Sequence, residues 1–404
     1  MQFSDVIGQQ PVKKQLAELV QHNRLSHALL FLGKEGSGSL PLAVAFAQYL
    51  VCEKVTRRGA GGGSHEAAPS LFGDALPVIK ETLMDSCGVC AACMKAAQLV
   101  HPDIHFSYPT VTKKPGEKPV ATDFITEWRE FVQFNPYGNA FDWIEAIKEK
   151  DNSQGKITAE ECNDIIRKLN LKSFESEYKI LIMWMPEYLG TEGNKLLKLI
   201  EEPPPNTLFI LVTENESLVL PTIVSRCQLI KIPALETSDI EVALIDRNKT
   251  EGPIARQVAG VSDGNYREAL QLVQHAEEDW QSLLREWLNA ILKTGPVAQT
   301  KWVEEMSRLG REKQKQFLRY FNHLLEQAIH YRYLGEQYSI SDKEKDFAER
   351  LNRIASIEQQ QAMIEELDRA SYYIERNAHG KMLFHALTIK LYHIIQDKIV
   401  FLAN

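Results

Sequence analysis

Along the first 235 residues, short apolar runs alternate with longer stretches of helical periodicity. The apolar runs are HALLFLG (27–33), DIHFSYP (103–109), KILIMWM (179–185), TLFILVT (207–213) and LIKIP (229–233). Most are apolar at nearly every position, which is typical of strands buried on both faces of a sheet. Helical patterns lie between them, for example at 40–53, 158–170 and 188–202. The alternation predicts an α/β fold, with a parallel sheet flanked by helices.

The strand pattern ends after Pro233, and helical spacing of apolar residues continues to the last residue. We therefore expect an α/β domain at 1–233, a small helical domain at 234–278 and an all-α domain at 279–404. Two segments, at about 55–80 and 110–155, interrupt the α/β pattern. The first is rich in glycine and alanine. Both are interpreted as insertions on the surface.

The composition is that of a soluble globular protein. Of 404 residues, 44% are hydrophobic and 25% charged, and the net charge of −8 gives no whole-chain sign of nucleic-acid binding. No apolar run approaches the roughly 18–20 residues needed to cross a bilayer. The first residues, MQFSDVIGQQ, lack the basic and apolar regions of a signal peptide. We expect a cytoplasmic protein that does not contact membranes and whose thiols stay reduced.

The stretch FLGKEGSGSLPLAV (31–44) has the strand, glycine loop and helix of a phosphate-binding P-loop. Gly33 and Gly38 fit the P-loop spacing, and Gly36 lies between them. Ser39 and Leu40, however, stand where a lysine would reach the phosphates and a hydroxyl would hold magnesium. The sequence therefore predicts either the remnant of a phosphate site or a simple turn between strand and helix.

A second part of a nucleotide site would be a pair of acidic residues at the end of a buried strand. The run KILIMWM ends in Trp184 and Met185, and neither side chain can hold a cation or activate water. Glu187 is the nearest carboxylate, but its offset is wrong. Two independent losses favour a catalytically silent site.

Six cysteines are present, and three of them are spaced three apart in MDSCGVCAACMKA, at Cys87, Cys90 and Cys93. Cys52 ends a preceding helix and can supply a fourth thiolate, although 34 residues separate it from Cys87. Four thiolates in a reducing compartment favour a closed, tetrahedral zinc site. An iron–sulfur cluster, whose ligands begin with the same spacing, and the absence of any metal remain alternatives.

Two arginine motifs are also candidates. Ser225, Arg226 and Cys227 lie where a helix is expected to end and the last strand to begin. In GNYREAL (264–270), Arg267 is predicted one turn inside a helix that Asp263 could cap. A surface ion pair is the alternative role for Arg226, and a solvated helix face is the alternative for Arg267.

Taken together, several motifs resemble the clamp loader subunits of bacterial DNA polymerase III over about residues 1–275. The motifs are MQFSDVIGQQPVKKQL, NRLSHALLFLGKEGSGS, HPDIHF, LLKLIEEPPPNTLFILVTENESLVLPTIVSRCQ and GNYREAL. In this family the ATPase type, tau/gamma, keeps the P-loop lysine and the acidic pair. The delta-prime type has a degraded nucleotide site and keeps the arginine of the SRC motif. This chain is similar to the delta-prime type.

The resemblance implies an AAA+ module with a helical lid (234–278) and a helical collar for oligomerisation (279–404). It implies a structural zinc ion on the cysteines of a 52–93 module. The degenerate loop of Gly33, Gly36, Gly38 and Ser39 would then bind no catalytic ATP. The subunit would not be an enzyme by itself. Arg226 would instead serve as an arginine finger, in trans, for a neighbouring ATPase subunit, a contribution of about 10³–10⁵ in rate.

The implied partners are the tau/gamma and delta subunits in a hetero-pentameric ring. The sliding clamp and primer-template DNA would be reached through the complex, which loads the clamp onto primed DNA. Two other functions remain as alternatives. One is a catalytically active P-loop ATPase of the tau/gamma type, and the other is a nucleic-acid-binding protein that depends on zinc or an iron–sulfur cluster.

Overall fold

The computed structural model describes residues 1–60, 84–112, 116, 118–148, 155–274, 280–335, 342–375 and 378–397. The chain divides into two compact units, Met1–Leu270 and Gln271–Asn404. Most of the insertion expected at about 55–80 lies outside the described residues, as does the boundary expected at 278–279.

The N-terminal unit is built on a five-stranded sheet in the order β2-β3-β4-β1-β5, with every pair of neighbours parallel. The strands are β1 (Ala28–Gly33), β2 (Ile104–Ser107), β3 (Lys179–Trp184), β4 (Thr207–Thr213) and β5 (Gln228–Ile232). Each falls on one of the five apolar runs. The predicted α/β fold with a parallel sheet is therefore confirmed.

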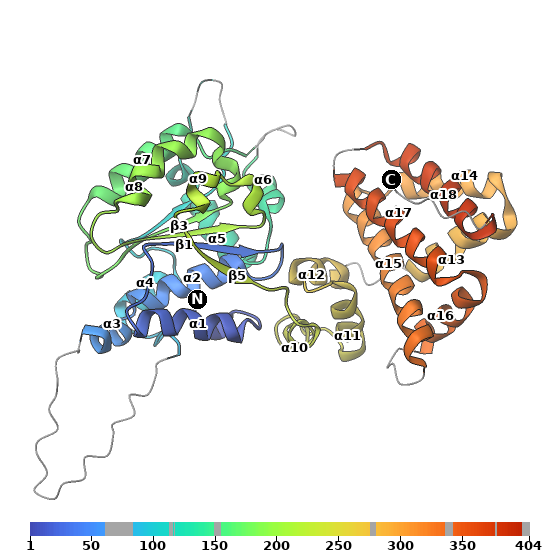
Figure 1. Cartoon of the computed structure of the whole chain (residues 1–404), viewed down its shortest axis with the longest axis horizontal. Helices are drawn as coiled ribbons and strands as arrows, with labels where there is room; N and C mark the ends of the chain where they lie inside the picture. Colours follow the sequence, from blue (N-terminus) through green and yellow to red (C-terminus); the bar gives the residue numbers. More distant parts are fainter. Residues whose placement is uncertain are drawn as a thin grey trace, which may run out of the picture. The chain divides into compact units, whose positions relative to one another are not determined.

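Helices cover both faces of this sheet (Figure 1). On one face lie α1 (Gln10–Gln21), α2 (Ser39–Val51) and α4 (Ala91–Ala97), and on the other α7 (Ala159–Asn170), α8 (Leu197–Glu201) and α9 (Pro221–Val224). Successive strand residues alternate between the two cores. Phe31 and Ile182, for instance, belong to the first core, and Leu30 and Leu181 to the second. This alternation explains why the strands are apolar at nearly every position.

One predicted helix differs from the structure. Residues 188–202 form a 3₁₀ helix, η3 (Pro186–Leu196), followed by the short α8. Gly190 interrupts η3 with a φ of 51° and a ψ of −141°, a conformation open mainly to glycine. The apolar spacing indicated one helix, but it could not reveal this interruption.

The surface position predicted for the 110–155 segment is wrong for its described part. The segment forms η2 (Ala121–Phe124), α5 (Ile125–Phe134) and α6 (Ala140–Ile147). Trp128 and Trp143 have no exposed surface and belong to the same core as α2. In ITEWREFVQF, Trp128, Phe131 and Val132 share one helix face, so burying that face removes large apolar surfaces from water.

After β5 the N-terminal unit continues in α10 (Thr237–Asn248), α11 (Gly252–Val261) and the start of α12 (Tyr266–Gln274); a further short helix, α3 (Glu53–Ala60), follows α2. The first turn of α12 contacts the loop after β1, because the Tyr266 amide donates to the Gly36 carbonyl (3.2 Å). The Tyr266 ring also meets the Tyr137 ring edge-on, at a centroid distance of 4.9 Å. These contacts fix the start of α12 on the α/β domain.

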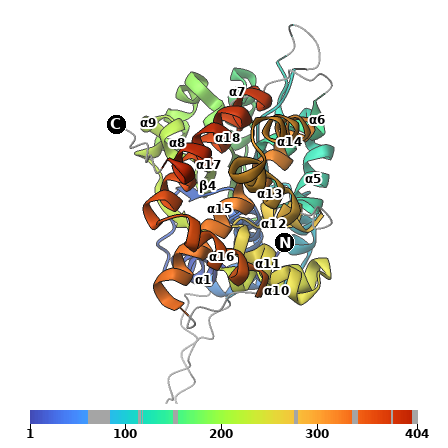
Figure 2. The same cartoon turned by 90° about the vertical axis from the view of Figure 1, so that its right-hand side faces the viewer.

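The described part of the C-terminal unit is helical (Figures 1 and 2). Its helices are α13 (Trp280–Asn289), the π-helical turn η5 (Ala290–Thr294), α14 (Pro296–Arg308), α15 (Arg311–Leu334), α16 (Asp342–Ile354), α17 (Ile357–Glu375) and α18 (Gly380–Gln396). Trp287 and Trp302 stack at 4.5 Å in its core. The all-α prediction for this region is confirmed. Nowhere in the described residues is there a helix both long enough and apolar enough to cross a membrane.

Candidate functional site

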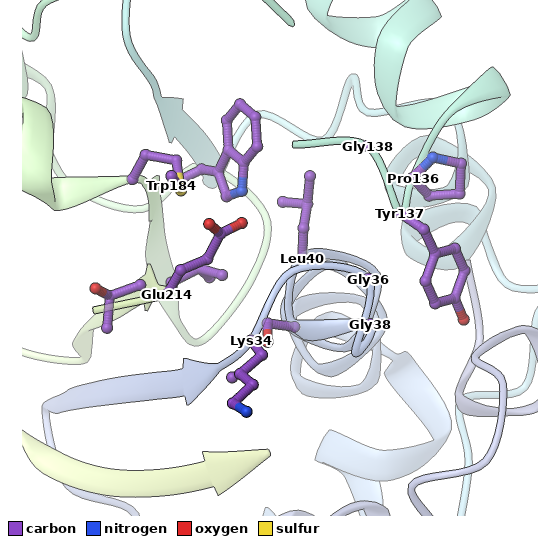
Figure 3. Close-up of a pocket in the computed structure, with 14 residues that line it drawn as sticks. Lys34, Gly36, Gly38, Leu40, Pro136, Tyr137, Gly138, Trp184 and Glu214 are labelled. Carbon is purple, nitrogen blue, oxygen red and sulfur yellow. The ribbon is translucent and has the colours of Figure 1, made fainter. Parts of the chain in front are cut away.

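The glycine loop predicted from the sequence joins β1 to α2. Gly36 and Gly38 have φ values of 70° and 91°, which L side chains rarely adopt. Gly38 is the N-cap of α2, so the first amides of this helix face the end of the sheet. The structure brings Gly33, Gly36, Gly38 and Ser39 together around one cavity at the carboxyl edge of the strands. Trp184 and Met185 line the same cavity, and Figure 3 shows Trp184 there.

Protein side chains fill most of the space beside the glycine loop. The cavity has a volume of about 20 Å³, room for roughly one water molecule. Pockets for small organic ligands generally measure about 300–1,000 Å³. Leu40, Tyr137 and Trp184 occupy much of the wall, and Figure 3 shows Leu40 and Trp184 with Glu214 beside them. Lys34 also lines the cavity, but its side chain points away from Glu214 (Figure 3).

Trp184 ends β3, where an acidic residue of a nucleotide site would stand. Its side chain is 3% exposed, and its ring lies 5.3 Å from that of Trp128 and 5.7 Å from that of Phe131, centroid to centroid. Tyr108 and Trp143 extend the same cluster on the other side of Trp128. The strand end where a magnesium ligand would be expected is thus occupied by Trp184, which packs at the border of an aromatic cluster from α5 and α6.

The carboxyl group of Glu214, which directly follows β4, lines the cavity. Burial raises the pKa of Glu214 to about 8; the carboxylates of Glu35 and Glu187 act in the same direction, and Arg267 opposes them. Glu187 Oε1 accepts hydrogen bonds from the amides of Glu214 (2.8 Å) and Asn215 (3.1 Å) and from the Thr213 hydroxyl. Glu187 therefore holds the turn after β4.

The sequence interpretation missed Glu214 as a residue of this site. A signal was present, because Glu214 directly follows a buried strand and ligand-facing groups of α/β sheets lie at the carboxyl ends of the strands. Nothing in the local pattern, however, indicated a carboxyl group with a raised pKa.

Arg267, in the first turn of α12, is not on a solvated face. Its side chain is 7% exposed. Its Nε and Nη2 donate to the two carboxylate oxygens of Asp142 (2.5 and 2.6 Å), and Nη1 donates to Glu35 Oε1 (3.0 Å). Asn139 donates from Nδ2 to the other oxygen of Glu35 (3.1 Å). The guanidinium of Arg267 is thus neutralised by carboxylates of its own chain.

Arg226 lies in the short turn between α9 and β5. Its Nε donates to Glu201 Oε1 (2.6 Å), its Nη2 also contacts that oxygen, and its Nη1 donates to the Thr222 carbonyl (2.6 Å). Ser225 Oγ accepts from Nη1 (3.3 Å), while burial raises the pKa of the Cys227 thiol to about 11. β1 and β5 are parallel neighbours. The start of β5 therefore lies at the amino ends of the strands, whereas the loop after β1 lies at their carboxyl ends. The structure therefore does not bring Arg226 to the loop of its own chain.

The four cysteines predicted as metal ligands form one cluster. Cys52, Cys87, Cys90 and Cys93 have sulfur atoms that all lie within 4.8 Å of one another. The sulfurs of Cys87 and Cys93 are 3.9 Å apart. Zn–S bonds of about 2.3 Å in a tetrahedron place sulfurs about 3.8 Å apart. The donor set and spacing fit a structural zinc ion, which needs no residue beyond these four.

Backbone amides stabilise the sulfur atoms. The amide of Cys87 donates to Cys52 Sγ (3.3 Å), and that of Cys93 donates to Cys90 Sγ (3.5 Å). Burial raises the pKa of the Cys52 and Cys93 thiols. Burial acts likewise on Cys87, but amide and thiol hydrogen bonds outweigh it and lower that pKa to about 6. A bound cation would favour the thiolate form at all four positions.

The sheet order, the glycine turn after β1 and the three helices after β5 define an α/β module of the AAA+ class. Residues 8–236, more than half of the chain, match the family model described as "DNA polymerase III, delta subunit". The chain belongs to this family.

Two curated relatives come from Bacillus subtilis (strain 168). The DNA polymerase III subunit delta' is 26% identical over 267 residues, which cover 66% of this chain and 59% of the relative. The DNA polymerase III subunit tau is 25% identical over 303 residues, which cover 74% of this chain and 41% of the relative. The matched part of this chain therefore spans between two fifths and three fifths of each relative's length.

Among solved structures, a DNA polymerase III gamma subunit-related protein from Thermotoga maritima is 15% identical, with a TM-score of 0.37, over 93% of this chain and 98% of that chain. The Bacillus subtilis DNA clamp loader delta protein is 11% identical, with a TM-score of 0.30, over 94% of this chain and 99% of that chain.

Proposed function

We propose that this chain is a clamp loader subunit of the delta-prime type that does not hydrolyse ATP itself. It acts in the cytoplasm, in a hetero-pentameric ring with tau/gamma and delta subunits. The ring loads the sliding clamp onto primed DNA, and this chain reaches the clamp and the DNA through the complex. The region 234–278 serves as the lid and 279–404 as the collar that joins the subunits.

The observation that carries this proposal is the filled cavity at the glycine loop. A nucleotide needs space, a cation for its phosphates and a ligand for magnesium. The cavity measures about 20 Å³, Trp184 stands in the place of a magnesium ligand, and the carboxyl group of Glu214 lines the cavity. The nearby guanidinium of Arg267 is already paired with Asp142 and Glu35. Each of these features supports a subunit whose own site is silent.

In this proposal, Arg226 is the residue through which the subunit contributes to ATP hydrolysis by its neighbour. Phosphoryl transfer depends on positioning and on stabilising the charge that develops in the transition state, and an arginine from a neighbour contributes about 10³–10⁵ in rate. The side chain of Arg226 is one third exposed. It lies at the amino ends of the parallel strands, away from the glycine loop at their carboxyl ends. It is therefore accessible to the ATP of an adjoining subunit.

Two measurements test the proposal. Purified chain is expected to show no ATP hydrolysis and no ATP binding at millimolar concentrations. In the reconstituted complex, Arg226→Ala is expected to lower clamp-dependent ATPase activity severely. Arg256→Ala, which removes an exposed arginine of α11, should leave that activity unchanged. Full activity of the Arg226→Ala complex would overturn the arginine-finger role.

A catalytically active ATPase of the tau/gamma type is the second candidate, favoured by the match to the tau subunit over 74% of this chain. Lys34, at the edge of the cavity, is the cation such an enzyme would have to use. ATP turnover by the isolated chain that is abolished by Gly38→Ala or Lys34→Ala would establish this candidate. A nucleic-acid-binding protein with zinc or an iron–sulfur cluster would instead show DNA binding by the isolated chain.

The cysteine cluster completes the proposal as a structural zinc site. Cys52 ends α2, whereas the other three ligands precede or open α4. A bound zinc ion would therefore fasten the end of α2 to α4 on one face of the sheet. It would take no part in phosphoryl transfer.

A further inference from the structure

The guanidinium of Arg226 is held on two sides by its own chain. Its Nε and Nη2 face Glu201 Oε1 at the end of α8, and its Nη1 faces the Thr222 carbonyl and Ser225 Oγ in α9 and the turn after it. A guanidinium has five N–H groups. Within the part of the chain that the structure describes, Nε and Nη1 donate hydrogen bonds to these acceptors and Nη2 contacts only Glu201 Oε1, which leaves an N–H of Nη2 for a group outside.

Glu201 is the only charged member of this set of acceptors. It comes from α8, whereas Arg226 lies in the turn after α9, so it fixes the arginine against the body of the domain. Both side chains are substantially exposed, 33% for Arg226 and 45% for Glu201, and ion pairs at this level of exposure contribute little to folding stability. The main effect of the Glu201–Arg226 pair is thus to orient the guanidinium, and its contribution to folding stability is small.

We propose that Glu201 is a positioning residue for Arg226. Its carboxylate holds the Nε edge of the guanidinium, so that the remaining N–H of Nη2 is directed outward, toward the triphosphate of a neighbouring subunit. This inference rests on the proposed function, because it needs Arg226 to act in trans. Pre-positioning matters in such a contact, since a side chain that must be ordered during the reaction stabilises the transition state less.

The test uses the reconstituted clamp loader with Glu201→Gln in this chain. Glutamine retains an acceptor oxygen but loses the charge that orients the guanidinium. Clamp-dependent kcat is expected to fall about tenfold, with the KM for ATP unchanged, because the neighbour's ATP-binding contacts remain. The variant complex should elute as the intact assembly in size-exclusion chromatography.

Glu202→Gln is the matched control. It removes the same charge from the adjacent residue, which is exposed and makes no hydrogen bond or ion pair with Arg226 in the described structure. Its kcat should equal that of the unchanged complex. In an Arg226→Ala background, Glu201→Gln should cause no further loss, because the positioned group is already absent.

The outcomes separate the two claims. If Arg226→Ala slows the complex and Glu201→Gln leaves it unchanged or faster, the positioning role is wrong and the proposed function stands. The positioning role is also wrong if Glu201→Gln costs as much in the Arg226→Ala background as alone. If Arg226→Ala itself has no effect, both claims fail.

Discussion

Arg267 and Asp142 form a two-point ion pair between α12 and α6, with nitrogen–oxygen distances of 2.5 and 2.6 Å. Glu35 of the glycine loop shares the same guanidinium (3.0 Å). One arginine thus joins three parts of the N-terminal unit at the place where a nucleotide's phosphates would otherwise meet a cation. The pair is formed within the chain and needs no ligand to complete it.

Replacing Arg267 by methionine should destabilise the protein by about 2–4 kcal/mol, because Asp142 and Glu35 would be left as poorly compensated, half-buried charges. Urea unfolding measures this change. Arg256→Met, in which the lost arginine is 79% exposed and paired with Glu241, should cost about 0–1 kcal/mol. Equal effects of the two variants would contradict a structural role for the Arg267 pair.

The stability contribution of Glu214 should depend on pH. Its pKa is about 8 in the folded protein, against 4.5 for an unperturbed glutamate, so the folded state binds the proton more tightly than the unfolded state does. Stability is therefore lost as the pH rises from about 4.5 through about 8. Glu214→Gln removes this loss and should stabilise the protein at pH 8 relative to its effect at pH 5 by on the order of 1–3 kcal/mol.

Urea unfolding of the Glu214→Gln variant and the unchanged chain at pH 5, 6.5 and 8 checks this expectation. Glu216→Gln is the control, because Glu216 is exposed two residues further on. A difference between variant and unchanged protein that does not grow from pH 5 to pH 8 would show that Glu214 titrates normally.

Gly36→Ala should loosen the start of α12. A Cβ at this position would lie 1.8 Å from Asn265 Oδ1 and 3.0 Å from Asn265 Cα, and the φ of 70° is itself unfavourable for alanine. The expected cost is about 1–3 kcal/mol. The amide of Tyr266, which donates to the Gly36 carbonyl, should exchange with solvent deuterium at least several-fold faster.

Gly252→Ala is the control for Gly36→Ala, since an added Cβ there has nothing within 4 Å. Its exchange pattern near Tyr266 should match that of the unchanged protein. Unaltered protection of the Tyr266 amide in Gly36→Ala would mean that α12 does not depend on the loop.

Metal analysis should find one zinc ion per chain, and Cys93→Ser should reduce this content to near zero. Structural zinc sites contribute roughly 10–16 kcal/mol in apparent binding free energy in small domains, so the 84–97 region should become sensitive to protease when a chelator is added. Cys162→Ser should keep the full zinc content, because Cys162 lies outside the four-cysteine cluster. Iron in place of zinc, with visible absorbance, would identify an iron–sulfur cluster instead.

The sheet and the cysteine cluster were predictable because their signals are local. Strands buried on both faces need apolar residues at nearly every position, and three cysteines at intervals of three leave few roles other than metal binding. The role of Cys52 as a fourth ligand could not be read from local spacing, because 34 residues separate it from Cys87 and only the fold brings the two together. In the structure, Cys52 is part of the four-cysteine cluster.

The partners of Arg267 and Trp184 could not be predicted because they are distant in sequence. Arg267 lies 125 residues from Asp142 and 232 from Glu35. Trp184 packs on aromatic residues of α5, a helix whose apolar face was misread as part of a surface insertion. A local pattern shows that a side chain needs an apolar neighbour or a counter-charge, but only the fold decides which one it meets.

The six tryptophans are divided equally between the two units. Trp128, Trp143 and Trp184 pack together, with Trp184 lining the cavity at the glycine loop, and Trp280, Trp287 and Trp302 belong to the helical core of the C-terminal unit. Each unit therefore has its own optical reporter. We expect emission from the first group to respond to changes at the loop. We expect the nearly parallel stack of Trp287 on Trp302, inclined by 3°, to give the second unit a near-ultraviolet dichroism of its own. Phenylalanine in place of one group would let the other unit be followed alone inside an assembled complex.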